Sequence, residues 1–359
     1  MNPSWQNIHK QFALNGVSHS KEALLEVAYS LIKEGKDFEK PIGDFLLDWC
    51  SPKPSLDVYT SGSTGAPKKI TLQKSQMLNS AMATGQYFGL EAGNTALLCL
   101  PVSSIAGKMM LVRAMVLGLR LDYVMPSSRP LLHTSCTYDF CAMVPLQAEK
   151  SLEKIGDIKT LILGGAAISF SLEKKLKKAP SRVFETYGMT ETITHVAVRQ
   201  VSPTTDNDFK LLPFVEISQD DRQCLVLKAP KVSSNPVVTN DLVELTSKTS
   251  FKWLGRYDNV INSGGIKLIP EQIEKKLSSM VENRFFVIGV PDETLGQKLI
   301  LVVEGEVKTN NLSQAIAKSP LLGKYEIPKE IFSTKKFIET KTGKVQRDKT
   351  LDLIKNSFP

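Results

Sequence analysis

Short apolar segments alternate with helical segments through about the first 190 residues, and this alternation restricts the fold more than any other feature. The expected strands are 55–59, 95–101, 119–125, 139–145, 159–165 and 182–188. Helical periodicity predicts helices over 21–36, 75–89, 106–118 and 169–179. Strands that are apolar along their whole length are typical of sheets that helices cover on both faces. The pattern therefore predicts an α/β fold.

The pattern changes after about residue 195. Strands without intervening helices are expected at 194–201, 214–218, 224–229 and 241–245, which predicts antiparallel pairing. A further α+β block has expected helices over 270–280 and 312–319 and expected strands at 285–290 and 298–305. We therefore predict a large N-terminal domain of mixed sheets flanked by helices, residues 1–257, and a smaller α+β C-terminal domain, residues 258–359.

The composition excludes several classes of protein. Apolar residues make up 42% of the chain and charged residues 23%, which is typical of globular proteins. Because no run of 18 or more apolar residues occurs, no membrane span is expected. The net charge of +8 suits an anionic ligand, but no aromatic residues interleave with a basic stripe, so nucleic acid is not an expected partner. Five cysteines without a CxxC pair predict reduced thiols and a cytoplasmic protein, and no His/Cys cluster indicates zinc.

The segment YTSGSTGAPKK, residues 59–69, is rich in glycine and hydroxyl groups and lies between two expected strands. Its exposed backbone N–H groups and hydroxyls, together with a lysine, form the kind of nest that binds phosphate oxygens. It is not a Walker A loop, because GxxxxGK[ST] is absent, and a surface turn is the simpler interpretation of the loop alone. The candidate phosphate-binding residues are Thr60, Ser61, Gly62, Ser63, Thr64, Gly65 and Lys68.

Three further motifs follow in order: YGMTE at 187–191, GRYDNVINSGGIKLIPEQIE at 255–274 and ETKTGKVQR at 339–347. Together with TSGSTGAPK they resemble the adenylate-forming superfamily, which includes acyl-CoA synthetases, peptide-synthetase adenylation domains and luciferases. The resemblance extends from about Leu56 to Arg347. It implies that ATP converts a carboxylate to an acyl-adenylate with release of pyrophosphate, and that the acyl group then passes to a thiol, usually that of CoA.

The resemblance also implies residue roles at the nucleotide. Thr190 matches the residue that contacts the α-phosphate, and Glu191 matches the magnesium ligand, a hard carboxylate that suits this ion. Asp241 matches the acid that binds the ribose, although this chain reads TND where the family usually has TGD, and Arg256 completes that site. The residues that resemble the adenine side of the site are Gly164, Gly165, Ala166, Tyr187 and Gly188, with the tyrosine stacked on the base.

The C-terminal motifs resemble the moving parts of the family. Lys344 matches the catalytic lysine that reaches between the carboxylate and the α-phosphate, where such a group stabilises developing charge. Asp258 matches the hinge about which the small domain swings between an adenylating pose and a thioester-forming pose. Gly264 and Gly265 would let the pantetheine arm of CoA pass close to the backbone.

The acid-binding residues are harder to assign. Many relatives read LPxxHxxG, whereas this chain reads LPVSSIAG, with Ser104 in place of the histidine. Lys108 and Arg113 follow on a predicted helix and are candidates for binding a second carboxylate, although five positions do not stack on one helix face and a salt-bridged surface explains them equally well. His195 is a candidate for the border of the acyl pocket, and an ordinary strand histidine is an equal interpretation.

About 55 residues precede the phosphate loop, fewer than in most acyl-CoA synthetases. Compact members with YGMTET and LPxxxIAGKMM resemble o-succinylbenzoate–CoA ligases of menaquinone synthesis, whose substrate has two carboxylates. The expected partners are therefore ATP, Mg²⁺, a small carboxylic acid and CoA. Three alternatives stay open: a CoA ligase for another aryl or fatty acid, an adenylation enzyme that loads a carrier protein, and a non-catalytic nucleotide-binding relative. The sequence leaves the oligomeric state open, a homo-oligomer included.

Overall fold

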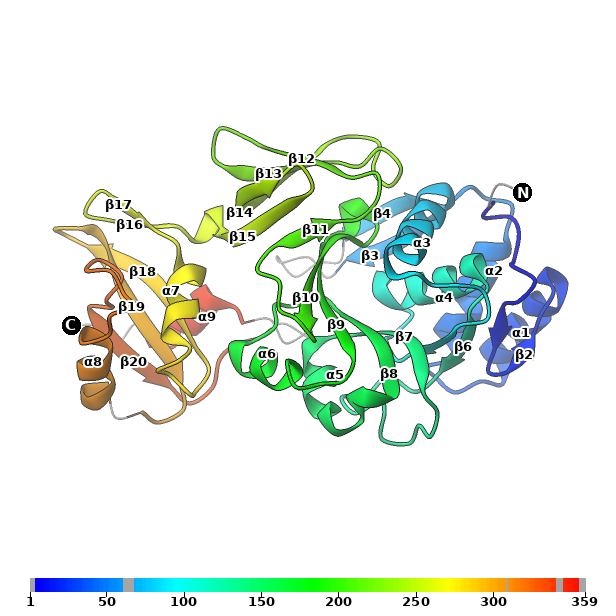
Figure 1. Cartoon of the computed structure of the whole chain (residues 1–359), viewed down its shortest axis with the longest axis horizontal. Helices are drawn as coiled ribbons and strands as arrows, with labels where there is room; N and C mark the ends of the chain where they lie inside the picture. The colour runs from blue at the N-terminus through cyan, green and yellow to red at the C-terminus, as the bar shows by residue number, and fades with distance from the viewer. Residues whose placement is uncertain (1–3, 61–67, 308, 340–344, 355–359) are drawn as a thin grey trace. The chain divides into compact units, whose positions relative to one another are not determined.

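The computed structural model describes residues 4–60, 68–307, 309–339 and 345–354 (Figure 1). Contacts divide the chain into two compact units. Unit 1 comprises Met1–Ile217, Val226–Val237 and Thr246–Ser250, and unit 2 comprises Ser218–Leu225, Val238–Leu245 and Phe251–Pro359. The division runs through four strands that follow one another in order: β12 (Glu216–Gln219), β13 (Cys224–Lys228), β14 (Val237–Ser247) and β15 (Ser250–Arg256). The predicted division into domains of residues 1–257 and 258–359 stays a prediction.

Apart from a separate hairpin, the other strands of unit 1 follow in the order β2-β1-β6-β5-β7-β8-β9-β10-β11 within the same mixed sheet, and Figure 1 shows β7 to β10 as neighbouring arrows. Pairing is parallel from β1 and β6 through β5, β7 and β8 to β9, and antiparallel from β9 to β10 and from β10 to β11. The bounds are β1 Ala13–Leu14, β2 Val17–Ser18, β5 Thr95–Leu98, β6 Arg120–Tyr123, β7 Tyr138–Met143, β8 Ile158–Leu163, β9 Arg182–Gly188, β10 His195–Ser202 and β11 Phe209–Leu211. The predicted α/β class is confirmed.

Helices cover both faces of this sheet. Alternate residues of its buried strands point to opposite sides, so each face presents apolar side chains that a helix can cover. Leu161 and Leu163 of β8 pack in one cluster with Leu172 and Leu176 of the following helix. On the other face, Phe88 packs against rings of β7 and β9. The helices are α1 Lys21–Lys33, α2 Lys40–Cys50, α3 Lys74–Phe88, α4 Ile105–Leu117, α5 Pro145–Lys150 and α6 Phe170–Leu176, with 3-10 turns η1 Leu152–Asp157 and η2 Thr190–Thr192.

Unit 2 has a second, smaller sheet in the order β17-β16-β19-β18, with β20 parallel to β19. Alternate residues of β18 pack on opposite faces: Val287 packs with Ile273 and Leu277, and Phe286 packs with Phe337 and Leu351. The bounds are η3 Tyr257–Asn259, β16 Ile261–Ser263, β17 Ile266–Leu268, α7 Pro270–Leu277, β18 Phe285–Asp292, β19 Gly296–Glu304, α8 Thr309–Ala317, β20 Glu330–Thr334 and α9 Arg347–Asp352. Within the residues that the structure describes, no helix combines the length and apolarity that crossing a membrane requires.

Candidate active site

The predicted phosphate loop is carried by a two-stranded hairpin of β3 (Ser55–Thr60) and β4 (Lys68–Gln73). Thr60 and Lys68 are register partners at its end, so the chain leaves and re-enters the hairpin at one point. Farther back, the Asp57 carboxylate accepts a hydrogen bond from Thr71 at 2.7 Å. The other candidate residues, Ser61, Gly62, Ser63, Thr64 and Gly65, lie outside the described residues.

The adenine-side candidates meet at the carboxyl ends of β8 and β9, the edge where open α/β sheets bind ligands. Gly164 directly follows β8, and its N–H donates to the Met143 carbonyl at 3.1 Å. A Cβ atom at Gly164 would lie 2.5 Å from Thr186 Oγ1, so this position requires glycine. Gly165 has a φ of +82°, which also favours glycine. The structure therefore brings Gly164, Gly165 and the exposed Ala166 beside the strand that ends in Tyr187 and Gly188.

Hydrogen bonds of the buried Thr192 side chain hold the turn after β9. Thr192 has no exposed surface, and its hydroxyl contacts the Met189 backbone N–H at 3.1 Å and the Thr194 carbonyl at 2.8 Å. Thr190 and the exposed Glu191 lie on the same 3-10 turn, and the Glu191 carboxylate has no hydrogen bond or ion pair with any described residue. Protein sites for Mg²⁺ use one or two carboxylates together with substrate phosphates, so one exposed carboxylate fits this ion.

The ribose candidates lie in unit 2. Asp241 is 7% exposed, and its Oδ1 accepts from the Trp253 indole N–H at 3.1 Å and lies 3.5 Å from an Arg256 guanidinium nitrogen. Arg256 also pairs with Asp258 at 2.8 Å. Burial lowers the pKa of Arg256, but Asp241 and Asp258 outweigh burial, so this pKa is raised. The structure therefore brings the predicted acid, arginine and hinge residue into one cluster.

Asn240, the residue that replaces the usual glycine of the TGD motif, joins this cluster. Its amide nitrogen lies 3.1 and 3.3 Å from the two carboxylate oxygens of Asp258, and its amide oxygen accepts from Arg222 at 2.9 Å. The Arg222 guanidinium also lies 5.2 Å from the ring centroid of Tyr257. Sequence analysis missed Asn240 and Arg222 because their partners are distant in the chain.

The glycines predicted to face pantetheine form the turn between β16 and β17. Gly264 and Gly265 have φ values of +58° and +81°, and two successive positive values are typical of tight hairpin turns. The Gly264 N–H donates to the Leu295 carbonyl at 2.8 Å. Lys344 lies outside the described residues, but its flanking residues Glu339 and Val345 form an antiparallel bridge.

Two of the acid-site candidates, Ser104 and Lys108, have contacts within the fold. Ser104 is the N-cap of this helix: its hydroxyl accepts from the Gly107 N–H at 3.3 Å and donates to the Pro101 carbonyl at 2.7 Å. The Lys108 ammonium lies 5.0 Å from the ring centroid of Phe45 on α2, and burial lowers the pKa of Lys108. No described contact joins Lys108 to Arg113, as expected for a spacing of five residues.

Arg113 is 2% exposed and has only neutral partners among the described residues. Its guanidinium lies 3.4 Å from the Thr84 hydroxyl, 3.3 Å from the Thr194 hydroxyl and 3.7 Å from the Met110 sulfur. Burial lowers the pKa of Arg113 to about 10, so the side chain still carries its charge at neutral pH. A buried cation with long contacts to neutral groups has hydrogen-bonding capacity left for an anion.

His195 and Ser80 connect this cation to a small pocket. His195 Nε2 lies 3.4 Å from the Thr84 hydroxyl, and burial together with the charge of Arg113 holds the pKa of His195 well below its ordinary value. The Ser80 hydroxyl lies 3.0 Å from that of Thr194. Sequence analysis missed Ser80 and Thr84, although two hydroxyl residues four positions apart share one helix face and were a usable signal.

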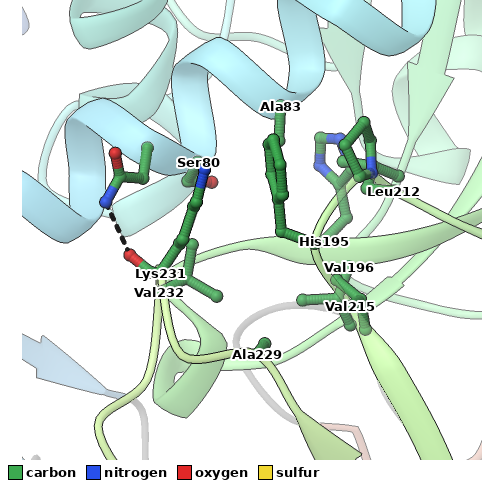
Figure 2. Close-up of a pocket in the computed structure, with 12 residues that line it drawn as sticks. Ser80, Ala83, His195, Val196, Leu212, Val215, Ala229, Lys231 and Val232 are labelled. Atoms are coloured by element: carbon green, nitrogen blue, oxygen red, sulfur yellow. Dashed lines mark hydrogen bonds between the residues drawn. The ribbon is translucent and has the colours of Figure 1, made fainter.

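The pocket itself is lined mainly by apolar side chains. Figure 2 shows Ser80 and Ala83 of α3 on one side and Val196, Val215 and Ala229 on the other. The enclosed volume is about 10 Å³, which is room for about one water molecule. A larger group would therefore enter only if side chains at the pocket move. Within the described residues, no group of three or more His, Cys, Asp or Glu side chains could hold a metal ion by itself.

Comparisons with known proteins show the family to which this fold belongs. A family model described as AMP-binding enzyme matches residues 36–222. A solved structure of an acyl-CoA synthetase (AMP-forming)/AMP-acid ligase II-like protein from Dyadobacter fermentans is 34% identical, covers 92% of this chain and 98% of that chain, and has a TM-score of 0.63.

Two further relatives are more distant. The 2-succinylbenzoate–CoA ligase of Listeria monocytogenes is 23% identical over 350 residues, which cover 90% of this chain and 74% of that protein. The solved structure of o-succinylbenzoate coenzyme A synthetase (MenE) from Bacillus subtilis, in complex with ATP and magnesium ion, is 21% identical. It covers 95% of this chain and 84% of that chain with a TM-score of 0.72, which shows that the fold is shared.

Proposed function

The chain belongs to the AMP-binding enzyme family of adenylate-forming acyl-CoA ligases, and from this premise we propose that its acid substrate is 2-succinylbenzoate. The proposal rests mainly on Arg113. A charged guanidinium buried without a carboxylate is costly, and a second carboxylate on the substrate would neutralise it. The similarity to 2-succinylbenzoate–CoA ligases supports the same substrate. The product would serve menaquinone biosynthesis.

The first step joins the reacting carboxylate to the α-phosphate of ATP and releases pyrophosphate. Thr60, Lys68 and the residues between them hold the β- and γ-phosphates, Thr190 contacts the α-phosphate, and Lys344 stabilises the charge that develops between the reacting groups. Glu191 would hold Mg²⁺, which would neutralise phosphate charge. Tyr187 and the Gly164–Ala166 loop hold the adenine, and Asp241 and Arg256 hold the ribose.

The second step passes the acyl group to the thiol of CoA and releases AMP. Rotation about Asp258 removes Lys344 from the reacting centre, and the turn at Gly264 and Gly265 then faces the pantetheine arm. Residues 258–359 are the moving domain in this proposal. Lys108, Ser104 and His195 stay candidates for contacts with the acid, and Arg113 holds the carboxylate that does not react.

An acid panel tests the substrate. We expect ATP–pyrophosphate exchange and CoA thioester formation with 2-succinylbenzoate, and far lower rates with benzoate, coumarate or fatty acids. Equal rates with benzoate would overturn the assignment, because the second carboxylate would then have no role. Exchange with amino acids and without CoA turnover would instead identify an adenylation enzyme that loads a carrier protein.

Separate assays of the two steps test the mechanism. Lys344→Ala should lower adenylate formation by about 10²–10³-fold and leave thioester formation from a synthetic acyl-adenylate near the wild-type rate. Asp258→Pro should do the reverse, because proline fixes φ near about −65° and restricts the residue before it. Equal damage to both steps by Lys344→Ala would contradict the two-pose mechanism.

A further inference from the structure

Arg347 forms the first turn of α9 and is held by two carboxylates of α7. Its guanidinium pairs with Glu274 through two contacts of 2.9 Å, to Oε1 and to Oε2, which is the strong bidentate arrangement. Glu271 Oε1 lies 3.8 Å from the same guanidinium, and Arg347 also donates to the Val287 carbonyl at 3.2 Å. Only 23% of the Arg347 side chain is exposed, so solvent screens these contacts weakly.

Helix α7 also forms hydrogen bonds with residues next to the predicted hinge. Glu271 Oε1 accepts from the side-chain amide of Asn259, the neighbour of Asp258, at 2.5 Å. Gln272 donates to the Leu254 carbonyl at 2.6 Å, just before the hinge turn. The first turn of α7 therefore contacts the chain on both sides of Asp258.

The segment around Arg347 is fixed at its other end as well. Gln346 donates its backbone N–H to the Ile338 carbonyl at 2.8 Å, and the Ile338 N–H donates to the Thr350 hydroxyl at 3.0 Å. Val345 and Glu339 pair as a bridge. The segments before residue 340 and after residue 344 are therefore hydrogen-bonded to each other and to α9.

We propose that Arg347 is a positioning residue for adenylation, which ties the chain that carries Lys344 to the hinge turn through Glu271, Glu274 and Asn259. The inference rests on the proposed function, because it assumes the roles of Lys344 and Asp258. Lys344 precedes Arg347 by three positions in the sequence. When Arg347 keeps its contacts with Glu271 and Glu274, the chain that carries Lys344 rotates together with the hinge turn. When these contacts are lost, the hinge can rotate without placing Lys344 correctly at the reacting centre.

The charge on Glu274 makes this tie sensitive to pH. Burial raises the pKa of Glu274 to about 7, against the opposing effects of the Arg347 charge and the Val287 N–H, while the neighbouring Glu271 raises it further. Arg347 from α9 and Glu271 from α7 are the charged groups that face it, and β18 contributes the N–H of Val287. Above about pH 7 the Glu274 carboxylate is ionised and pairs with Arg347 as a charge, and below about pH 7 this carboxyl group is protonated.

The test compares Arg347→Met, Arg347→Lys and Glu274→Gln with a matched control, Lys276→Met. Lys276 lies on the same helix and forms an ion pair of 2.6 Å with Glu326, which has no described contact to Arg347 or to the hinge. Adenylation is followed by ATP–pyrophosphate exchange with 2-succinylbenzoate, thioester formation from the synthetic acyl-adenylate and CoA, and folding by thermal unfolding.

We expect Arg347→Met to lower adenylation by about 10–100-fold, the cost of misplacing a catalytic group by about 1 Å, and to change the thioester step by less than about threefold. Arg347→Lys should recover part of the loss, because it keeps the charge without the bidentate geometry. In the wild type, adenylation should fall more steeply than thioester formation below about pH 7, and Glu274→Gln should remove that difference. Lys276→Met should lower the unfolding temperature without separating the two steps.

The opposite results are equally clear. If Arg347→Met lowers both steps together, in proportion to its lower unfolding temperature, Arg347 is only a stabilising residue and the inference is overturned. Normal adenylation in Arg347→Met but not in Lys344→Ala overturns the inference and leaves the proposed function standing. Normal adenylation in Lys344→Ala overturns the proposed function and the inference with it.

Discussion

Two arginines of unit 1, Arg113, which is buried, and Arg199, which is largely buried, have opposite surroundings. Arg199 on β10 lies 2.9 Å from Glu173 and 2.7 Å from Glu185, and burial, which lowers its pKa, is outweighed by these carboxylates so that the pKa is raised. Arg113 on α4 contacts two hydroxyls and a thioether, and burial lowers its pKa to about 10. Arginine is therefore paired with carboxylates at one place, and at the other it has no anionic partner among the residues that the structure describes.

The difference separates an arginine whose charge is paired within the fold from one that we propose to bind the substrate. Arg199 joins α6, β9 and β10, and its partner Glu185 also accepts the Ile168 N–H at 3.1 Å, which holds the loop after β8. This ion cluster needs no further partner. Arg113 has no comparable ion pair among the described residues, and this contrast supports the proposal that it binds an anionic ligand.

Removing Arg199 should give the largest loss of stability. Arg199→Met leaves Glu173 and Glu185 with uncompensated charges in a largely buried site, and breaking such an ion pair typically costs about 3–5 kcal/mol. Denaturant unfolding of the variant and of wild type measures the difference. Arg113→Met is the control: it removes an isolated buried charge, so its unfolding free energy should be unchanged or higher. Equal losses in the two variants would erase the distinction between the two arginines.

Removing Arg113 should instead reduce catalysis. A charge-assisted contact to a second carboxylate contributes about 1.5–3 kcal/mol, so Arg113→Met should lower kcat/KM for 2-succinylbenzoate by roughly ten- to over a hundredfold. Rates with a monocarboxylate of similar size should change little, because that acid never used the contact. A parallel fall with both acids would assign Arg113 to packing.

Two glutamates that pair with arginine should respond to pH in opposite directions. Burial raises the pKa of Glu173, but Arg199 and Lys177 outweigh it, so the pKa is lowered from 4.5; the stability it adds is present above 4.5 and lost as the pH falls through the folded value. The pKa of Glu274 is raised from 4.5 to about 7, since burial outweighs Arg347. The folded state there holds the proton more tightly, so stability falls as the pH rises from 4.5 to about 7.

Matched glutamine variants separate these two effects. Relative to wild type, Glu173→Gln should be less stable at pH 7 and approach wild type in acid. Glu274→Gln should gain on wild type between pH 4.5 and about 7, by an amount on the order of 1–3 kcal/mol. Unfolding free energies across this pH range provide the measurement, and curves with the same slope for both variants would contradict the opposite signs.

Part of the backbone framework of the site was predictable from the sequence. The apolar segments that end near Gly164 and Tyr187 were predicted as strands, because apolar patterning is local, but their pairing as parallel neighbours was not predicted. Gly264 and Gly265 were predicted only to let the pantetheine arm pass, and the tight turn that their positive φ values form was not predicted.

The side-chain clusters were not predictable in the same way. Arg113 meets Thr194 across 81 positions, and Asn240 meets Asp258 across 18, and no local pattern encodes such pairs. The spacing of Lys108 and Arg113 did predict that they leave the helix in different directions, but not that one meets a ring and the other a set of hydroxyls. Charge alone does not distinguish the two arginines in the sequence, whereas the neighbours that the structure gives them do.

Lys108 provides the finest test of the contrast, because it is a further cation of unit 1 whose described contact is with a neutral group. Its ammonium lies over the Phe45 ring at 5.0 Å, and burial lowers its pKa although Asp48 and Asp44 partly oppose this effect. Lys108→Met should cost about 0.5–1 kcal/mol of unfolding free energy, the usual size of a cation–π contact, and change the preference for a dicarboxylate by less than about threefold. Unfolding curves and kcat/KM for the two acids measure both quantities. A loss of preference as large as that of Arg113→Met would show that Lys108 reaches the acid too, and that a neutral partner by itself does not mark a binding cation.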